Sequence, residues 1–209
     1  KSPTFKGYKY SNKPDLKAHA EVTRQSATEG MVLLENNGVL PLKDVKKVAV
    51  FGNAAYTWIA GGTGSGDVNR AYTVNLLEGL KNAGYEANDE LKAEYEKWFV
   101  DENTRNEGIN AERQKNWLPA IRPAEMNIDA KVLAEQAKSQ DVAIIAIGRI
   151  SGEGSDRNIE GDFELTAAEK ALIKNVTTAF HAQGKKAVVV LNIGGVIETA
   201  SWKNIPDAV

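Results

Sequence analysis

The sequence predicts an α/β fold in which helices pack on a mostly parallel β-sheet. Three short, predominantly apolar runs, at residues 48–52, 141–148 and 187–191, have the length and composition of strands buried on both faces. Segments with helical periodicity separate the later runs, and this alternation indicates right-handed crossovers onto a parallel sheet. Hydrophobic residues make up 42% of the 209 residues and charged residues 26%, which is typical of a globular protein with its own core.

The amino-terminal part is predicted to be a linker followed by a helix. Residues 1–14 show no period, so we interpret them as an interdomain linker, and residues 15–209 as one α/β-sandwich domain. Pro14 and Asp15 favour a helix start, because proline presets the first turn and aspartate suits its positive end. The helix is expected to reach about residue 34, unless a strand replaces it over residues 31–34.

The segment after the first strand contains a loop, two helices and a second loop. Residues 61–67 are predicted to form a loop, since four of the first six are glycine and can adopt left-handed conformations. Leucines at helical spacing predict a helix over residues 73–83, and Gly84 is a natural stop signal. A highly charged helix is expected over residues 87–104. Residues 105–128 lack a period, which predicts a long functional or mobile loop.

The carboxyl-terminal half shows a more regular pattern. Helices are predicted over residues 129–139 and 166–181, and the second opens with a capping box formed by Thr166 and Glu169. Residues 204–209 resemble the approach to a further buried strand. We therefore expect the chain to be a piece of a longer protein.

Two irregular segments should open on the same edge of the sheet. The glycine-rich segment follows strand 48–52, and residues 149–164 follow strand 141–148. The carboxyl ends of parallel strands share an edge, and ligands of such sheets bind there. The sequence therefore predicts that both segments open on the edge of the sheet where ligands bind.

Composition excludes several classes of function. The chain has no cysteine and two histidines, so it offers no thiolate nucleophile, no disulfide and no Cys/His zinc site. The net charge of −2 provides no positive surplus for nucleic acid or an anionic membrane. The longest apolar runs are much shorter than a membrane span of about 20 residues. We expect no nucleic-acid partner, no membrane partner and no metal.

The most informative candidate is Glu153. It stands between Gly152 and Gly154, whose backbone can take unusual shapes at the edge of a cleft, and a general acid needs such a placement. Asp156 and Arg157 can fix this segment by charge-assisted hydrogen bonds. The alternative is that Glu153 is one of 28 acidic residues in a solvated loop, and composition alone favours that interpretation.

The glycine-rich segment and the tryptophans are weaker candidates. The spacing of its glycines matches neither the dinucleotide fingerprint nor a phosphate-binding P-loop, so it is either a tight turn or a sugar contact through Ser65 and Asp67. Trp58 and Trp117 lie in irregular segments and could stack on a sugar ring, although core packing is the default for a tryptophan.

Several segments together carry a family resemblance. They are residues 23–36, 40–42, 48–52, 61–66 and 152–157, whose sequences occur in one characteristic order. In this order they resemble the second, α/β-sandwich domain of glycoside hydrolase family 3. The resemblance implies a three-layer sandwich with a mostly parallel, flavodoxin-like sheet.

The resemblance also implies a function. The domain would belong to a retaining, exo-acting β-glycosidase of the β-glucosidase or β-xylosidase type, which hydrolyses terminal β-linked sugars without a cofactor. Glu153 would be its acid/base, and substrate contacts would fall on Gly64, Ser65, Asp67 and Arg157. A TIM-type barrel of the same protein, absent from this chain, would carry the aspartate nucleophile. The isolated domain is therefore expected to be inactive, with an ordinary, exposed Glu153 carboxylate.

Two alternatives remain. The chain could be a non-catalytic carbohydrate-binding or scaffold module of the same fold, or a flavodoxin-like nucleotide binder, which the glycine spacing disfavours. The sequence does not determine the sugar, the linkage or the compartment, for which a periplasmic or secreted location is favoured over a cytoplasmic one.

Overall fold

The computed structural model describes residues 12–62, 64–116, 118, 120–150 and 156–209. The chain forms two compact units, Lys1–Leu33 and Leu34–Val209. The described part of the first unit contains helix α1 (Leu16–Glu29), whose first turn is capped by the Asp15 carboxylate. The predicted helix start is confirmed, but residues 31–34 form no strand.

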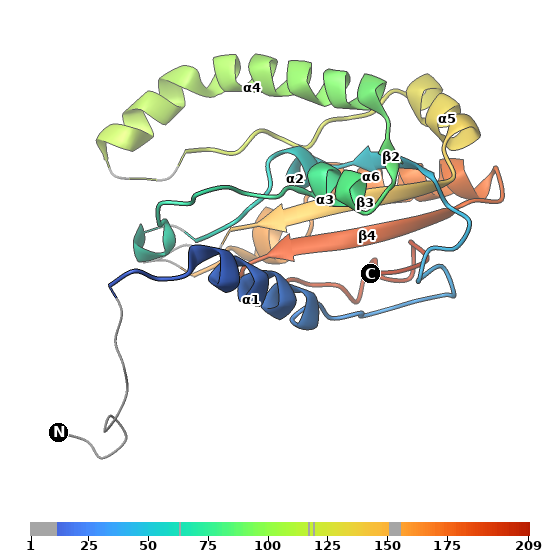
Figure 1. The fold of residues 1–209 in the computed structure, drawn as a ribbon. Coiled ribbons are helices and arrows are strands. Elements are labelled where there is room, and N and C mark those ends of the chain that lie inside the picture. The colour runs from blue at the N-terminus through green and yellow to red at the C-terminus, as the bar shows by residue number, and fades with distance from the viewer. Residues whose placement is uncertain (1–11, 63, 117, 119, 151–155) are drawn as a thin grey trace. The chain divides into compact units, whose positions relative to one another are not determined.

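The second unit is built on a four-stranded, fully parallel sheet with the order β2-β1-β3-β4 (Figure 1). The strands are β1 (Lys47–Phe51), β2 (Glu86–Ala87), β3 (Val142–Arg149) and β4 (Lys186–Ile193). This order is that of the flavodoxin-like fold, in which the direction of winding reverses between β1 and β3. The predicted fold class and its three long strands are confirmed. Strand β2 was not predicted, because two residues carry no periodic signal.

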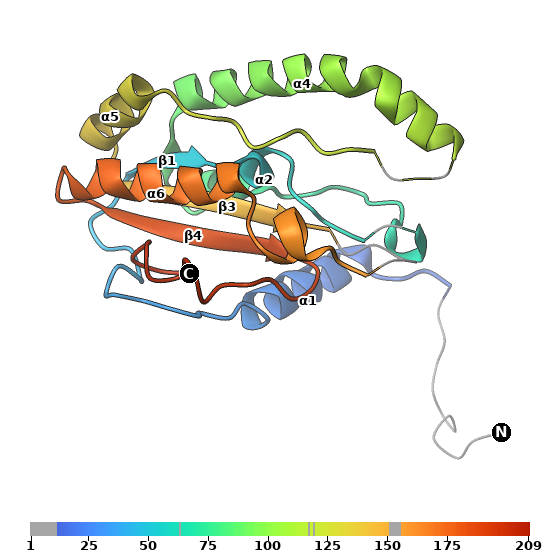
Figure 2. The ribbon, with the colours of Figure 1, turned by 180° about the vertical axis from the view of Figure 1, so that it is seen from behind.

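Helices cover both faces of the sheet (Figures 1 and 2). One face packs against α4 (Asp89–Lys115), α5 (Ala130–Ser139) and α6 (Ala167–His181), and the other against α3 (Leu76–Asn82), while the short α2 (Asn53–Tyr56) follows β1. In strand β3, Ile145 is buried against the face covered by α4, α5 and α6, and Ile144 is buried against the face covered by α3. Burial on both faces explains why its sequence is continuously apolar.

Helix α4 corrects one expectation. It continues to Lys115 instead of ending near residue 104, so the predicted loop over residues 105–128 is much shorter. Only the first half of the helix carries buried apolar residues, Leu91 and Tyr95. The second half is exposed and has no apolar stripe, so its helical state left no periodic signal in the sequence.

Residues near the carboxyl-terminal end of the chain lie beside β4. Ala208 bridges Val188 in parallel and Asn36 in antiparallel orientation. The Asp207 carboxylate accepts hydrogen bonds from Lys186 Nζ and His181 Nε2, both at 2.8 Å, and from Ala187 N at 2.9 Å. These contacts anchor the segment to the amino end of β4.

Candidate functional site at the carboxyl edge of the sheet

The two predicted segments leave the same edge of the sheet. Phe51, the last residue of β1, pairs with Ile145 of β3, so the chain after β1 emerges beside the end of β3. A pocket of about 620 Å³ lies where they meet, lined among others by Gly61, Gly62 and Asp67 of the glycine-rich segment and by Ile150 after β3. The expected shared edge of these segments is therefore confirmed.

Side chains at this pocket supply both apolar and polar contacts. Trp58 is half-buried in its wall, next to Ile59, and Arg122 lines it from the segment after α4. An aromatic face beside a guanidinium can hold a ring with hydroxyl groups. Trp117, the other predicted stacking residue, lies outside the described residues.

The glycine-rich segment forms a short turn held by Arg70. A 3₁₀ turn, Gly64–Gly66, begins with Gly64 in the left-handed region at φ 62°, and both Gly64 and Ser65 are exposed. Asp67 Oδ1 accepts a hydrogen bond from Arg70 Nη2 at 2.9 Å. A Cβ at Gly61 would lie 3.0 Å from Arg70 Nη1, so this arginine packs closely against the segment. The three predicted contact residues Gly64, Ser65 and Asp67 thus lie close together in one turn.

Gly52 determines how the chain leaves β1. Its φ of 92° is in the region that favours glycine, and a Cβ at this position would collide with the carbonyl oxygen of Ala146 on β3. Its N–H donates to the hydroxyl of the fully buried Tyr95 at 2.7 Å. The chain therefore turns tightly over β3 at the point where the winding of the sheet reverses.

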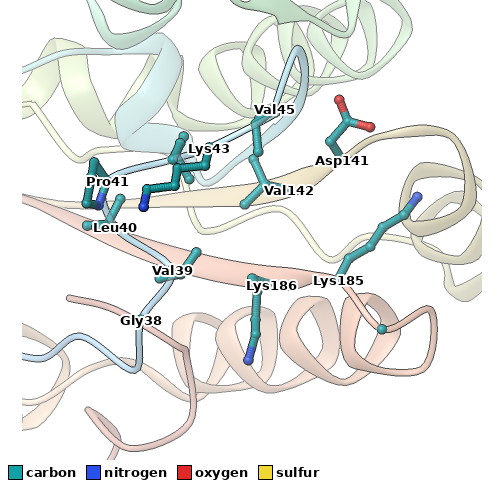
Figure 3. A pocket seen from close by; sticks show the side chains of 12 residues that line it. Gly38, Val39, Leu40, Pro41, Lys43, Val45, Asp141, Val142, Lys185 and Lys186 are labelled. Atoms are coloured by element: carbon teal, nitrogen blue, oxygen red, sulfur yellow. The ribbon is translucent and has the colours of Figure 1, made fainter.

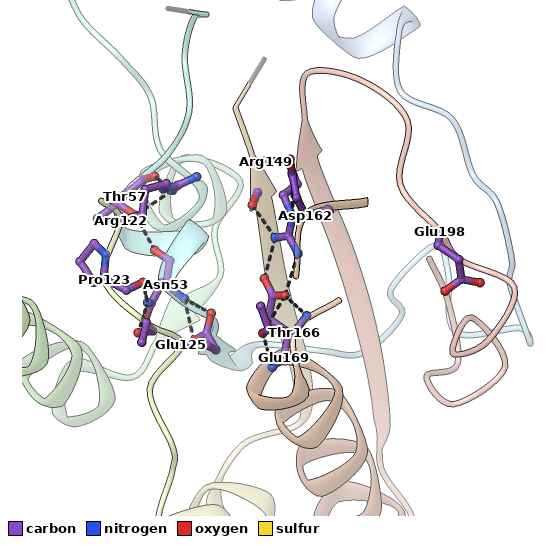
Figure 4. A network of polar contacts seen from close by, with 12 residues as sticks. Asn53, Thr57, Arg122, Pro123, Glu125, Arg149, Asp162, Thr166, Glu169 and Glu198 are labelled. Atoms are coloured by element: carbon purple, nitrogen blue, oxygen red, sulfur yellow. Dashed lines mark hydrogen bonds and ion pairs between the residues drawn. The ribbon is translucent and has the colours of Figure 1, made fainter. Parts of the chain in front are cut away.

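A second pocket, of about 350 Å³, lies at this reversal point (Figure 4). Asn53, Glu125, Arg149 and Glu169 line it, and Arg122 lines both pockets. Ligands of open α/β sheets bind at such reversal points. Sequence inspection did not bring these residues together, because they come from four separate segments.

Glu125 is an unusual carboxyl group in this pocket. Its pKa is raised to about 8, chiefly by burial and also by the nearby Glu169, while hydrogen bonds from the N–H groups of Asn53 and Met126 oppose the shift. The Asn53 N–H lies 3.0 Å from Oε1 of Glu125. Glu125 is therefore mostly protonated at neutral pH.

Arg149 and Glu169 form a buried, two-pronged ion pair. Nη1 and Nη2 of Arg149 lie 2.6 and 2.7 Å from the two carboxylate oxygens of Glu169. The same carboxylate accepts hydrogen bonds from N and Oγ1 of Thr166, which confirms the predicted capping box of α6. The capping role was visible in the sequence, but the pairing with Arg149 was not.

The last predicted site residues lie after β3. Arg157 Nη1 lies 2.5 Å from Oδ1 of Asp162. Glu153 lies outside the described residues, which omit 151–155.

A further pocket, of about 340 Å³, lies at the opposite edge of the sheet (Figure 3). It is lined by Lys185 and Lys186, which precede and begin β4, and by Val142, which begins β3. Lys185 Nζ donates to the carbonyl oxygens of Ala137 and Lys138, so this lysine is held in structural contacts. We do not assign a function to this edge, because ligands of parallel sheets bind at the carboxyl ends of the strands.

The described residues contain neither a metal-binding cluster nor a membrane-spanning helix. No group of three or more histidines, aspartates or glutamates there is arranged to hold a metal ion. None of the helices formed by those residues combines the length and apolar character needed to cross a bilayer.

Comparison with known proteins identifies the family. Residues 31–209 match the family model described as the glycosyl hydrolase family 3 C-terminal domain. The chain belongs to glycoside hydrolase family 3. It is 35% identical to β-glucosidase A of Butyrivibrio fibrisolvens over 88% of the chain, and 35% identical to a β-glucosidase of Ruminococcus albus over 94% of it.

A solved structure of the same family agrees with the fold. β-Glucosidase 3B of Thermotoga neapolitana, solved in complex with glucose, is 42% identical and superimposes with a TM-score of 0.85 over 99% of the chain. The chain spans only 24% and 20% of the two bacterial relatives and 28% of this structure. It therefore corresponds to one domain of these proteins.

Proposed function

We propose that this family 3 domain forms one wall of the active site of a retaining, exo-acting β-glycosidase. The substrate would be a β-linked oligosaccharide or glycoside, cleaved at its terminal sugar in the manner of a β-glucosidase or β-xylosidase. The observation that carries this proposal is the pocket between Gly61 and Ile150. It lies between the glycine-rich turn and the segment that contains Glu153, the two elements to which the family resemblance assigns sugar contacts and acid/base catalysis.

The partner wall would be a TIM-type barrel of the same protein. Large apolar side chains are exposed on segments that follow three adjacent strands: Val68, Tyr72, Ile159 and Val196 are between 62% and 74% exposed. Apolar surface of this kind is suited to burial against another domain. The chain spans only 24% and 20% of two relatives, so those proteins have ample additional length for a barrel.

The chemistry would follow the two-step retaining mechanism. A barrel aspartate attacks the anomeric carbon while the bond to the leaving oxygen breaks, and Glu153 donates its proton to that oxygen. The Glu153 carboxylate then takes a proton from water, whose oxygen attacks the anomeric carbon and releases the aspartate. No metal or cofactor takes part in either step.

The remaining predicted residues would bind the sugar. Ser65 and Asp67 offer hydroxyl and carboxylate groups on the exposed turn, and Gly64 lets the backbone approach closely. Arg157 uses Nη1 for Asp162 and would direct its other donors to substrate.

The deciding experiment uses the full protein that contains this domain. We expect Glu153→Gln to lower kcat/KM for an alkyl β-glucoside by a factor on the order of 10² to 10⁴, because a poor leaving group needs the proton. The dinitrophenolate of a dinitrophenyl β-glucoside leaves without a proton, so kcat/KM for this substrate should change little. Glu153→Ala should be rescued by azide with formation of a glycosyl azide.

The matched control is Glu160→Gln, which removes an exposed carboxylate from the same segment. It should leave both substrates unaffected. Equal losses on both substrates in Glu153→Gln, or no loss, would remove Glu153 from the acid/base role. The alternative of a carbohydrate-binding module predicts measurable glucose affinity of the 209-residue chain alone, whereas we expect none by titration calorimetry, since one wall supplies few contacts.

A further inference from the structure

We propose that the pocket at the reversal point of the sheet binds the carboxylate of a small molecule, with Arg122 as its main contact. The pocket has a volume of about 350 Å³ and is lined entirely by residues of the second unit (Figure 4). Its ligand can therefore be sought with this domain alone, whatever reaction the whole protein catalyses.

The pocket lies where open α/β sheets bind their ligands. Asn53 follows β1, Arg149 ends β3 and Glu169 lies in the first turn of α6, so three elements of the sheet and its cover meet there. Arg122 and Glu125 line the pocket from the segment between α4 and α5. In a sheet of this strand order, ligands bind outside the carboxyl ends of the strands at this point.

The acidic groups of the pocket are neutralised within the protein. Both carboxylate oxygens of Glu169 are paired with Arg149, at 2.6 and 2.7 Å. Oδ1 of Asp162 is bonded to Nη1 of Arg157. Glu125 is mostly protonated at neutral pH, because burial raises its pKa. None of the described acidic residues that line the pocket therefore leaves a negative charge unmatched.

Arg122, by contrast, carries a charge that the described residues do not match. Among them its guanidinium forms no ion pair, and its hydrogen bonds, from Nη2 to O and Oγ1 of Thr57, are long at 3.4 Å. Desolvation and the like charge of Arg149 lower the pKa of Arg122, although the side chain remains charged as arginines do. An anion beside this guanidinium would balance its charge.

The available donors suit a carboxylate. A guanidinium presents N–H groups side by side in one plane, which match the two oxygens of a carboxylate. The protonated carboxyl of Glu125 adds an O–H donor, and the positive end of α6 adds a favourable potential, since Thr166 at its start lines the pocket. A phosphate group carries more charge and more acceptor atoms than these donors match.

Glu125 should couple binding to pH. Its carboxyl is faced by Glu169 from α6, which is paired with Arg149, by Tyr95 from α4, and by Arg122 from its own segment. Tyr95 stays neutral, because burial raises its pKa well above the ordinary value. When Glu125 loses its proton near pH 8, it repels a bound anion and attracts Arg122. The affinity for a carboxylate should therefore fall as the pH rises through 8.

The test is titration of the 209-residue chain with sodium acetate at pH 6.5, exchanged for sodium chloride at constant ionic strength. We expect saturable shifts of the amide NMR signals of Asn53, Thr57 and Gly148, with a Kd in the millimolar range, because so small a ligand makes few contacts. Acetamide, the neutral analogue, should cause no such shifts. Arg122→Gln should abolish them, whereas Arg24→Gln, which removes an exposed arginine of α1, should retain them.

Two further variants keep the proposal testable if Arg122→Gln disturbs the pocket. Arg122→Lys keeps the charge but loses the planar donors, so it should bind acetate several-fold more weakly than the parent. Between pH 6.5 and pH 9.5 the affinity of the parent should fall about tenfold, the effect of a one-unit change in the pKa of Glu125 on binding. Glu125→Gln should show no such fall, since its side chain does not ionise.

Three results would overturn the proposal. They are equal shifts in the parent and in Arg122→Gln, equal shifts with acetamide and acetate, and saturable shifts with inorganic phosphate but none with acetate. An affinity of the parent that does not change up to pH 9.5 would remove Glu125 from the site. These measurements follow binding to the isolated domain, whereas the test of Glu153 follows leaving-group dependence in the full protein, so the two proposals can fail separately.

Discussion

Replacing Glu125 by glutamine should stabilise the 209-residue chain near neutral pH. The carboxyl has a pKa of about 8 in the folded protein, against an ordinary value of 4.5. Folding therefore favours its protonated form, and glutamine has nearly the shape of that form. Its amide oxygen can still accept hydrogen bonds from the N–H groups of Asn53 and Met126.

The sign and size of this stability change follow from proton linkage. Between pH 4.5 and 8 the unfolded chain loses this proton while the folded chain keeps it, so the free energy of unfolding falls as the pH rises. Each pKa unit corresponds to about 1.4 kcal/mol, so the cost of Glu125 at pH 7 is roughly 2–3 kcal/mol after allowance for partial exposure. This loss of stability caused by Glu125 is absent below pH 4.5 and no longer changes with pH above pH 8.

The assay is urea unfolding of both proteins from pH 4.5 to pH 9. We expect the two curves to approach each other at the acid end and to differ by about 2–3 kcal/mol at pH 7, with Glu125→Gln the more stable. Exposed Glu135→Gln is the control and should follow the parent. A stability difference that does not change with pH, or a less stable variant at pH 7, would refute the reasoning.

Two further substitutions test the fold around the site and the end of the chain. Gly52→Ala should lower the free energy of unfolding in urea by about 4 kcal/mol or more, because the new methyl group would collide with the carbonyl oxygen of Ala146. The control is Gly84→Ala, at a similar φ of 89° but with open space around the new methyl group, and it should lower the free energy of unfolding by roughly 1–2 kcal/mol. Burial opposes ionisation of Asp207, but Lys186 and His181 lower its pKa on balance, so its stabilising contribution is lost as the pH falls. Asp207→Asn should therefore cost about 2 kcal/mol at pH 7 and progressively less in acid, as urea unfolding at several pH values can measure, while exposed Asp101→Asn should cost little.

The sequence was sufficient for the elements that depend on local pattern. Continuous apolar runs predicted β1, β3 and β4, because a strand buried on both faces leaves no polar position. Thr166 and Glu169 predicted the start of α6, since a capping box needs only residues three apart. The shared edge of the two irregular segments also followed, because parallel strands place their carboxyl ends together.

The side-chain contacts that define the site could not be predicted in this way. The pairing of Arg149 with Glu169, the bond between Arg157 and Asp162, and the partly buried position of Glu125 depend on which helix covers which face of the sheet. The length of α4 was also missed, because its exposed second half has no apolar period. Apolar spacing reports how one segment faces the core, whereas ion pairs and shifted pKa values depend on distances and desolvation that arise only when separate segments pack together.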